Sequence, residues 1–152
     1  MSNACARNGA RRGSVVDNAL VSGKLEALRR VLARVREHTP ADAQALATNL
    51  DAQDIVCLNL QRAVQLCVDI AYHLLASTPA QAEPLTMADA FAALGKIGMI
   101  GAPLSESLRQ AVGFRNIAVH QYEQMDWNIV FDVATKRIVD LEAFARLLAS
   151  RL

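Results

Sequence analysis

Apolar residues recur along most of the chain at intervals of three and four positions, which is the spacing of helices that bury one face. The first such segment covers residues 17–38, and its apolar positions are Leu20, Val21, Leu25, Leu28, Val31, Leu32 and Val35. Thr39-Pro40 ends this helix, because the residue before a proline avoids the helical region. Residues 41–52 are alanine-rich with a weak period, which fits a connector or a short helical turn.

A second, longer helix is predicted to begin at Asp51 or Asp54 and to run to about Ser77. Apolar residues occupy most of its sides: Ile55, Val56, Leu58, Leu60, Val64, Leu66, Val68, Ile70, Leu74 and Leu75. A helix of this kind is either central to a bundle or shared between a fold and a dimer interface.

Shorter helical segments follow in the second half of the chain. Thr86 opens a third helix with an approximate capping box, and Pro103 begins a fourth at the first helical position, which proline tolerates. Asp126 and Asp140 open two more, with a break expected at residues 136–137. Strand signals and internal repeats are absent from the sequence. The pattern therefore predicts an all-α bundle of four to six helices.

Length and composition fit a single globular domain. A chain of 152 residues can bury about 70% of its unfolded surface, and 53% apolar with 20% charged residues is a globular composition. The net charge of +1 supplies no overall attraction to nucleic acid, so any positive potential must be local. The candidates for such a potential are arginines: Arg29, Arg30, Arg34, Arg36 and Arg115. The alternative for the first four is a solvated helix surface.

Residues 1–14 are small, polar and basic and carry no apolar period, whereas the helical pattern fills residues 15–152. We therefore expect a disordered basic arm followed by one helical domain. The arm can also be interpreted as an extension that results from a start codon assigned too far upstream, or as a tail that contacts RNA. Cys57 and Cys67 would lie about 15 Å apart along one helix, too far for a disulfide. Reduced thiols, the lack of a long apolar run and the lack of a signal-peptide core predict a cytoplasmic protein without a membrane segment.

The candidate chemistry gathers in residues 113–122, which read GFRNIAVHQY. Arg115 can bind a phosphate bidentately and stabilise charge that develops on it, while His120 can accept and donate a proton near neutral pH. Asn116 can hydrogen-bond the phosphate or the His120 ring; a helix-end hydrogen-bonding pair with Arg115 is the alternative. This division of labour in phosphodiester chemistry needs no metal. No acidic pair or His-Cys cluster has metal-ligand spacing, so we predict neither a metal nor a cofactor.

The five-residue offset between Arg115 and His120 places them about 140° apart on a continuous helix. The two side chains converge only if the helix breaks between them, if Arg115 reaches around, or if two protomers pool their residues. We expect residues 113–122 to lie at a helix junction, with Ile117 and Val119 in the core. We also expect a homodimer whose composite cleft contains two copies of each residue.

Arg62, Asp69 and His73 lie on the second helix at separations that place them on one stripe. Two interpretations stay open for this stripe. It forms either an intrahelical charge pair on a hydrated seam or a wall of the active cleft that faces Arg115 and His120.

The stretch Arg-x-x-x-x-His-x-Tyr, here RNIAVHQY, resembles the signature of HEPN domains and specifically of the HepT toxins. The resemblance takes in Gly113-Phe114 before the arginine. It extends upstream to residues 54–71, DIVCLNLQRAVQLCVDIA, which are similar to the second helix of that family. In total it covers roughly residues 20–150, so the expected fold is a HEPN-like bundle.

The resemblance implies the toxin of a type VII (HEPN/MNT) toxin–antitoxin system. Such a toxin is an endoribonuclease acting on RNA, with tRNA as the expected substrate. With His120 as general base or acid, the ribose 2′-hydroxyl would attack the scissile phosphate and leave a cyclic phosphate. Tyr122 would be modified with AMP by an MntA-like nucleotidyltransferase antitoxin, which adds negative charge and bulk in front of Arg115. From the residues alone, Tyr122 can also be a partly buried core phenol. The competing functions are a catalytically inactive HEPN module that assists a nucleotidyltransferase and a purely structural helical subunit.

Overall fold

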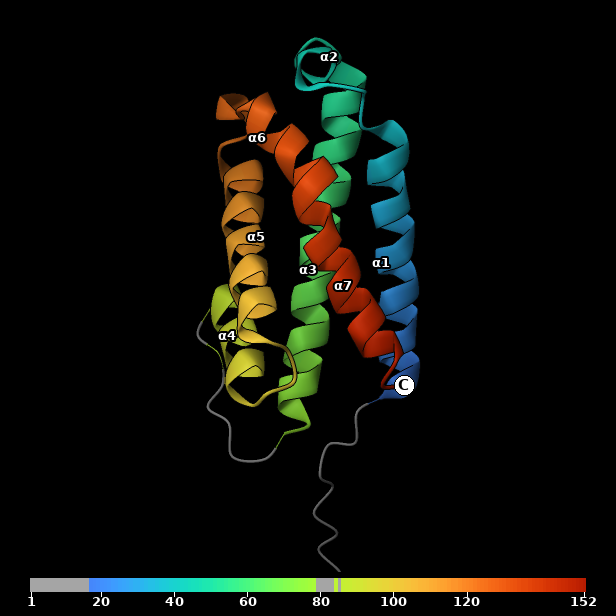
Figure 1. Cartoon of the computed structure of the whole chain (residues 1–152), viewed down its shortest axis with the longest axis vertical. Coiled ribbons are helices and arrows are strands. Elements are labelled where there is room, and N and C mark those ends of the chain that lie inside the picture. The colour runs from blue at the N-terminus through green and yellow to red at the C-terminus, as the bar shows by residue number, and fades with distance from the viewer. Residues whose placement is uncertain (1–16, 79–83, 85) are drawn as a thin grey trace, which may run out of the picture.

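The computed structural model describes residues 17–78, 84 and 86–152, and these residues form a helical bundle (Figure 1). The elements in chain order are α1 (Asn18–His38), α2 (Ala43–Ala47), α3 (Leu50–Ala76), α4 (Met87–Lys96), α5 (Ala102–His120), η1 (Tyr122–Gln124), α6 (Trp127–Asp132), η2 (Val133–Arg137) and α7 (Ile138–Ala149). No strand occurs among the described residues. The all-α prediction is confirmed, whereas the predicted basic arm at residues 1–14 lies outside the described part of the chain.

The last three elements form one continuous helix, because α6, the π-helical turn η2 and α7 follow one another without an intervening loop. The backbone N–H of Ile138 donates to the carbonyl of Val133, five residues earlier, which is the hydrogen bond of a π-turn. The break that the sequence suggested at residues 136–137 is therefore wrong. Counted this way, the described residues contain six helices, within the predicted range.

The long helix α3 is the centre of the bundle. It packs against α1, α4, α5 and α7, and α7 crosses in front of it between α5 and α1 (Figure 1). Among the described residues it alone has the length and hydropathy that a membrane span requires, but 56% of its most apolar window is buried inside the fold. The core therefore accounts for its apolar character. Its first turn is capped by Asn49, whose side chain accepts from the N–H of Ala52 at 3.0 Å, so neither Asp51 nor Asp54 has the predicted capping role.

The hairpin of α4 and α5 positions the helix that carries the candidate chemistry. Thr86 and Asp89 form the predicted capping box at the start of α4. The turn between the two helices includes Gly98, whose φ of +75° is a left-handed conformation that glycine adopts without strain. The hydroxyl of Ser105 then donates to the carbonyl of Phe91 at 2.9 Å and joins the helices in the interior.

Replacing Gly95 with alanine is expected to destabilise this hairpin. A Cβ at Gly95 would lie 2.9 Å from Oγ and 3.1 Å from Cβ of Ser105, whose hydroxyl is engaged with Phe91. Such overpacking costs about 1–3 kcal/mol, which equals or exceeds the gain of about 1 kcal/mol from alanine's helix propensity. Gly23→Ala is the matched control, because a Cβ at that exposed position of α1 meets nothing within 4 Å.

Urea unfolding of the two variants measures both effects in one experiment. We expect the free energy of unfolding to fall for Gly95→Ala and to rise by about 1 kcal/mol for Gly23→Ala. Equal stabilisation of both variants would contradict the close packing between α4 and α5.

Candidate functional site

Arg115, Asn116 and His120 all lie on the last two turns of α5, which is helical without interruption from Ala102 to His120. The backbone N–H of Gln121 still donates to the carbonyl of Ile117, at 2.8 Å, so the helix is closed up to the histidine. The helix therefore does not break between Arg115 and His120, and the helix junction in residues 113–122 lies at Gln121, between α5 and η1.

The side chains between them are not in the core. Ile117 is 49% and Val119 43% exposed, contrary to the sequence-based expectation. On a continuous helix Arg115 and His120 point about 140° apart, with Arg115 half-buried and His120 exposed. One side of a single α5 cannot present both groups to the same phosphate unless the Arg115 side chain reaches around.

The guanidinium of Arg115 has no carboxylate partner among the described residues. Its Nη1 donates to the side-chain oxygen of Asn116 at 3.1 Å, so the alternative of a helix-end hydrogen-bonding pair is present in the structure. Because this bond uses one of the five N–H donors of the guanidinium, the others can still bind an anion.

Tyr122 lies in η1, directly after α5, and is held from two sides. Its hydroxyl donates to Oδ1 of Asp54 on α3 at 2.6 Å, and its ring meets Trp127 edge to face at a centroid distance of 6.0 Å. Burial and the hydrogen bond to Asp54 raise the pKa of the Tyr122 phenol above its usual value, so the hydroxyl keeps its proton at neutral pH. Asp54 was considered from the sequence only as a possible helix cap.

The contacts of α3 show that its first half lies beside the signature and its second half does not. The side chain of Gln61 donates to the carbonyl of Ala118 at 3.5 Å, and α3 runs antiparallel to α5 (Figure 1). Arg62, the next residue of α3, therefore lies beside the C-terminal end of α5. It is exposed and forms no ion pair with any described residue. It remains a candidate for contact with a substrate.

Asp69 and His73 are directed toward α1 instead. Lys24 of α1 pairs with Asp69 at 3.4 Å, and Nε2 of His73 accepts from the backbone N–H of Asp17 at 3.0 Å. The two residues also lie about 12 and 18 Å farther along α3 than Gln61. The prediction that they form a wall facing Arg115 and His120 is therefore wrong within one protomer, because helical spacing shows a shared stripe but not which neighbour covers it.

Two of the four arginines of α1 are paired with carboxylates. Nε of Arg36 donates to Glu142 of α7 at 3.1 Å, and Arg29 pairs with Glu26 at 3.4 Å. Since α3 separates α1 from α5 (Figure 1), this arginine face does not extend the surface around Arg115. The alternative of a solvated helix surface fits it better.

Within the described ranges, no group of three or more His, Cys, Asp or Glu side chains is arranged to hold a metal ion. Cys57 and Cys67 are free and buried, and burial together with the nearby Asp54 charge raises the pKa of Cys57 to about 12. Neither thiol is therefore a nucleophile at neutral pH.

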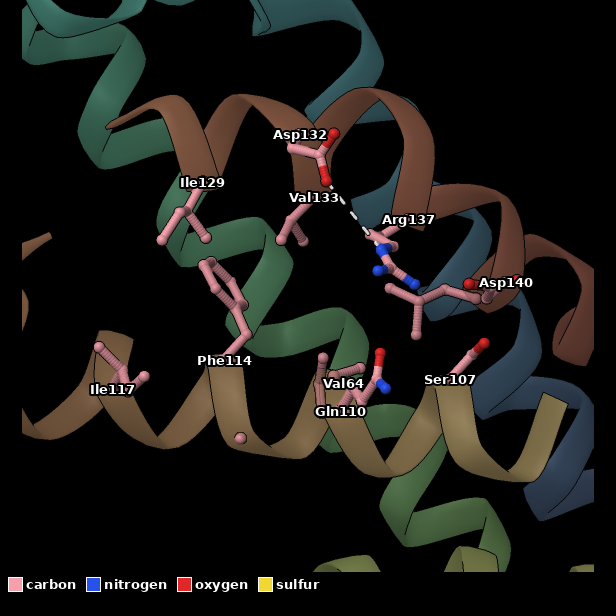
Figure 2. Close-up of a pocket in the computed structure, with 13 residues that line it drawn as sticks. Val64, Ser107, Gln110, Phe114, Ile117, Ile129, Asp132, Val133, Arg137 and Asp140 are labelled. Carbon is pink, nitrogen blue, oxygen red and sulfur yellow. Dashed lines mark ion pairs between the residues drawn. The ribbon is translucent and has the colours of Figure 1, made fainter. Parts of the chain in front are cut away.

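A pocket of about 410 Å³, which sequence reasoning missed, opens between α5 and the continuous helix formed by α6, η2 and α7 (Figure 2). Phe114 and Ile117 from the signature lie in its wall. Only the tertiary arrangement brings these helices together, so no local pattern in the sequence could have indicated the pocket.

The family model described as Ribonuclease HepT-like matches residues 27–148. A Shewanella oneidensis protein described as mRNA nuclease HepT is 33% identical over 127 residues, which are 84% of this chain and 94% of that protein. An Aphanizomenon flos-aquae protein described as tRNA nuclease HepT is 24% identical over 137 residues, covering 90% of this chain and 92% of the relative.

Solved structures of toxin–antitoxin complexes have the same fold. The tri-AMPylated Shewanella oneidensis HEPN toxin in complex with MNT antitoxin superimposes with a TM-score of 0.80 at 32% identity, over 88% of this chain and 98% of that chain. A toxin–antitoxin complex with AMP-PNP gives a TM-score of 0.81 at 31% identity, over 88% of this chain and 99% of that chain.

Proposed function

Because the chain belongs to the HepT-like ribonuclease family, we propose that it is the toxin of a toxin–antitoxin pair. In this proposal it is a cytoplasmic endoribonuclease that a nucleotidyltransferase antitoxin inactivates by AMPylation. The observation that carries the proposal is the end of α5, where Arg115 has no carboxylate partner among the described residues, His120 is exposed, and Tyr122 follows directly. The family resemblance of the signature and the complexes of AMPylated HEPN toxin support it.

The two relatives differ in the class of RNA that their descriptions name. One relative is described as an mRNA nuclease and the other as a tRNA nuclease. The tRNA substrate expected from the sequence therefore stays a prediction, and tests must follow both classes of RNA.

In the proposed mechanism, Arg115 binds the scissile phosphate and stabilises the charge that develops on its oxygens. His120 accepts the proton of the ribose 2′-hydroxyl as that oxygen attacks phosphorus, or donates a proton to the leaving 5′-oxygen. The products are a 2′,3′-cyclic phosphate and a 5′-hydroxyl, and no step requires a metal ion.

A two-fold homodimer would bring Arg115 and His120 to the same phosphate. Since Arg115 and His120 diverge on one α5, Arg115 of one protomer and His120 of its partner can meet at one phosphate when the ends of two α5 helices face each other. Apolar side chains that such an interface can cover are present near this end, because Leu58 of α3 is 54% and Val119 of α5 is 43% exposed.

AMPylation of Tyr122 would inactivate the site through charge and bulk. The added phosphate would place negative charge two residues after His120, where it would compete with the RNA phosphate for Arg115. In this reaction the phenol oxygen attacks the α-phosphorus of ATP held by the antitoxin, and pyrophosphate leaves. Asp54, which already accepts the hydrogen bond of this phenol, is placed to take its proton.

Replacing Asp54 with asparagine should slow AMPylation of Tyr122 by about 10²-fold or more, because a carboxamide cannot accept the phenol proton. RNA cleavage should be retained. Mass spectrometry of the toxin after incubation with antitoxin and ATP measures the modification. Asp51→Asn is the control, since Asp51 is exposed on the preceding turn and has no side-chain partner among the described residues. Modification of Asp54→Asn at the wild-type rate would show that the hydrogen bond is only structural.

Induced expression in a bacterial host without any antitoxin tests the proposed function. We expect wild type to arrest growth while tRNA or mRNA is degraded. A harmless wild-type protein with intact cellular RNA would contradict the nuclease and favour the catalytically inactive HEPN module.

A further inference from the structure

The pocket between α5 and the α6–η2–α7 helix has two chemically different ends (Figure 2). One end is apolar, where Phe114 and Ile117 of α5 lie across from Ile129 and Val133. The other end is polar, and its lining side chains are Ser107, Gln110, Arg137 and Asp140. Its volume of about 410 Å³ is within the range of small-molecule sites, which combine an apolar wall with a few polar groups.

The π-turn contributes directly to this pocket. Val133 and Arg137, its first and last residues, both line the cavity. A π-turn inside an α-helix is rare, and such turns occur frequently at functional sites. Here it lies where the helix passes over α5, so the irregular backbone and the cavity coincide.

The polar groups of the pocket are largely without partners. Asp140 is half-buried, yet it forms no hydrogen bond or ion pair with any other residue of the described part. Ser107 and Gln110, which face it from α5 (Figure 2), likewise have no side-chain partner there. Among the described residues, Arg137 pairs only with Asp132, at 4.0 Å, and Asp132 also pairs with Lys136 at 3.2 Å. A half-buried carboxylate such as Asp140 needs hydrogen-bond donors, and the N–H groups of a ligand can supply them.

We propose that this pocket binds one base of the RNA substrate, with guanine as the base that fits. The flat faces of a base suit the apolar end, where it can stack against the Phe114 ring, as unpaired bases do on aromatic side chains. Among the RNA bases only guanine presents two adjacent nitrogen donors on its Watson–Crick edge, and a carboxylate such as Asp140 can accept from both. Its O6 and N7 acceptors match an arginine, which Arg137 supplies.

The pocket connects to the candidate catalytic residues along the exposed side of α5. Ile117 at its apolar end and His120 are three residues apart, so they are neighbours on the helix surface and both are exposed. Gly113, one turn earlier, lines the pocket and has open space where a Cβ would be. A nucleotide with its base in the pocket can therefore lay its sugar and phosphate over Gly113 and Ile117 toward His120. This inference rests on the proposed ribonuclease function.

Titration of the purified protein with each of the four ribonucleoside monophosphates, followed by NMR chemical shifts, tests the inference without requiring cleavage. We expect guanosine monophosphate to bind about tenfold or more tightly than the other three, and Asp140→Asn to remove this preference. Ile129→Trp, at a position that is 57% exposed, should fill the apolar end and weaken all binding without unfolding the protein. Glu106→Gln is the control, because Glu106 lies next to Ser107 on α5 but outside the pocket.

Equal binding of all four nucleotides, or an unchanged preference in Asp140→Asn, would overturn the inference. The base preceding the cleavage sites in RNA gives a second readout. If the protein cleaves RNA without a preference for guanine before the cut, the guanine site is contradicted but the ribonuclease function is not. If the protein binds guanosine monophosphate selectively but cleaves no RNA, the guanine site is supported and the proposed function is contradicted.

Discussion

Alanine at His120 or at Arg115 is expected to abolish RNA cleavage and the growth arrest that depends on it. Loss of a general acid or base costs about 10²–10⁴ in rate, and loss of a donor that stabilises transition-state charge costs about 10²–10³. His120 is exposed, and within the described part of the chain the side chain of Arg115 bonds only to Asn116. Both variants should therefore stay folded, with changes in stability of about 0.5 kcal/mol for the surface residue.

Cleavage of end-labelled RNA by the purified variants measures this effect. Arg109→Ala is the matched arginine control on α5, because Arg109 pairs with Glu106 on the exposed surface, and Gln121→Ala controls for the position next to His120. Wild-type rates in the Arg115 and His120 variants would remove both residues from the mechanism.

Mixing the two inactive variants distinguishes the possible arrangements of the pair. If Arg115 of one protomer acts with His120 of its partner, a mixed dimer of Arg115→Ala and His120→Ala contains one complete site, and part of the activity returns. If both residues act from the same α5, no mixture restores cleavage. Recovery on mixing is the result that the homodimer with a composite cleft predicts.

Phenylalanine at Tyr122 should leave the toxin active and make it resistant to the antitoxin. The variant lacks the oxygen that accepts AMP but keeps the ring that meets Trp127. Loss of the hydrogen bond to Asp54 should cost about 1 kcal/mol of stability, which is too little to unfold the bundle. Without modification, no phosphate blocks Arg115, so co-expressed antitoxin should not restore growth.

Growth under co-expression and the intact mass of the purified toxin provide the measurement. Tyr72→Phe is the control, because Tyr72 is the other tyrosine of the chain and lies half-buried in α3; it should be modified and neutralised like wild type. Neutralisation of Tyr122→Phe by the antitoxin would show that inhibition uses another residue or binding alone. Loss of RNA cleavage in this variant would place the phenol itself in the nuclease mechanism.

Patterns that depend on local sequence predicted the fold well. The three- and four-residue spacing and Thr39-Pro40 placed α1, which ends at His38, and the capping box at Thr86 opens α4 as expected. The apolar sides of α3 indicated either a central helix or one shared with a dimer interface, and α3 lies at the centre of the bundle. These features depend on residues only a few positions apart, so they can be predicted from the sequence alone.

Features that depend on tertiary neighbours were missed or predicted wrongly. The divergence of Arg115 and His120 on a helix favoured a break between them, yet α5 is continuous through both and ends only at Gln121. Asp54 and Tyr122 are 68 residues apart in the sequence, and no local pattern links them. Asp69 was placed correctly on a stripe of α3, but its partner turned out to be Lys24 of α1.

The most direct test of the account is cleavage of a defined RNA by the purified protein in the presence of EDTA, with the new ends identified. We predict that cleavage persists in EDTA, leaves a 2′,3′-cyclic phosphate and a 5′-hydroxyl, and stops when the nucleotide before the cut has no 2′-hydroxyl. His120→Ala should give none of these products. Cleavage that EDTA prevents and Mg²⁺ restores, or products that end in a 3′-hydroxyl, would contradict the mechanism assigned to Arg115 and His120.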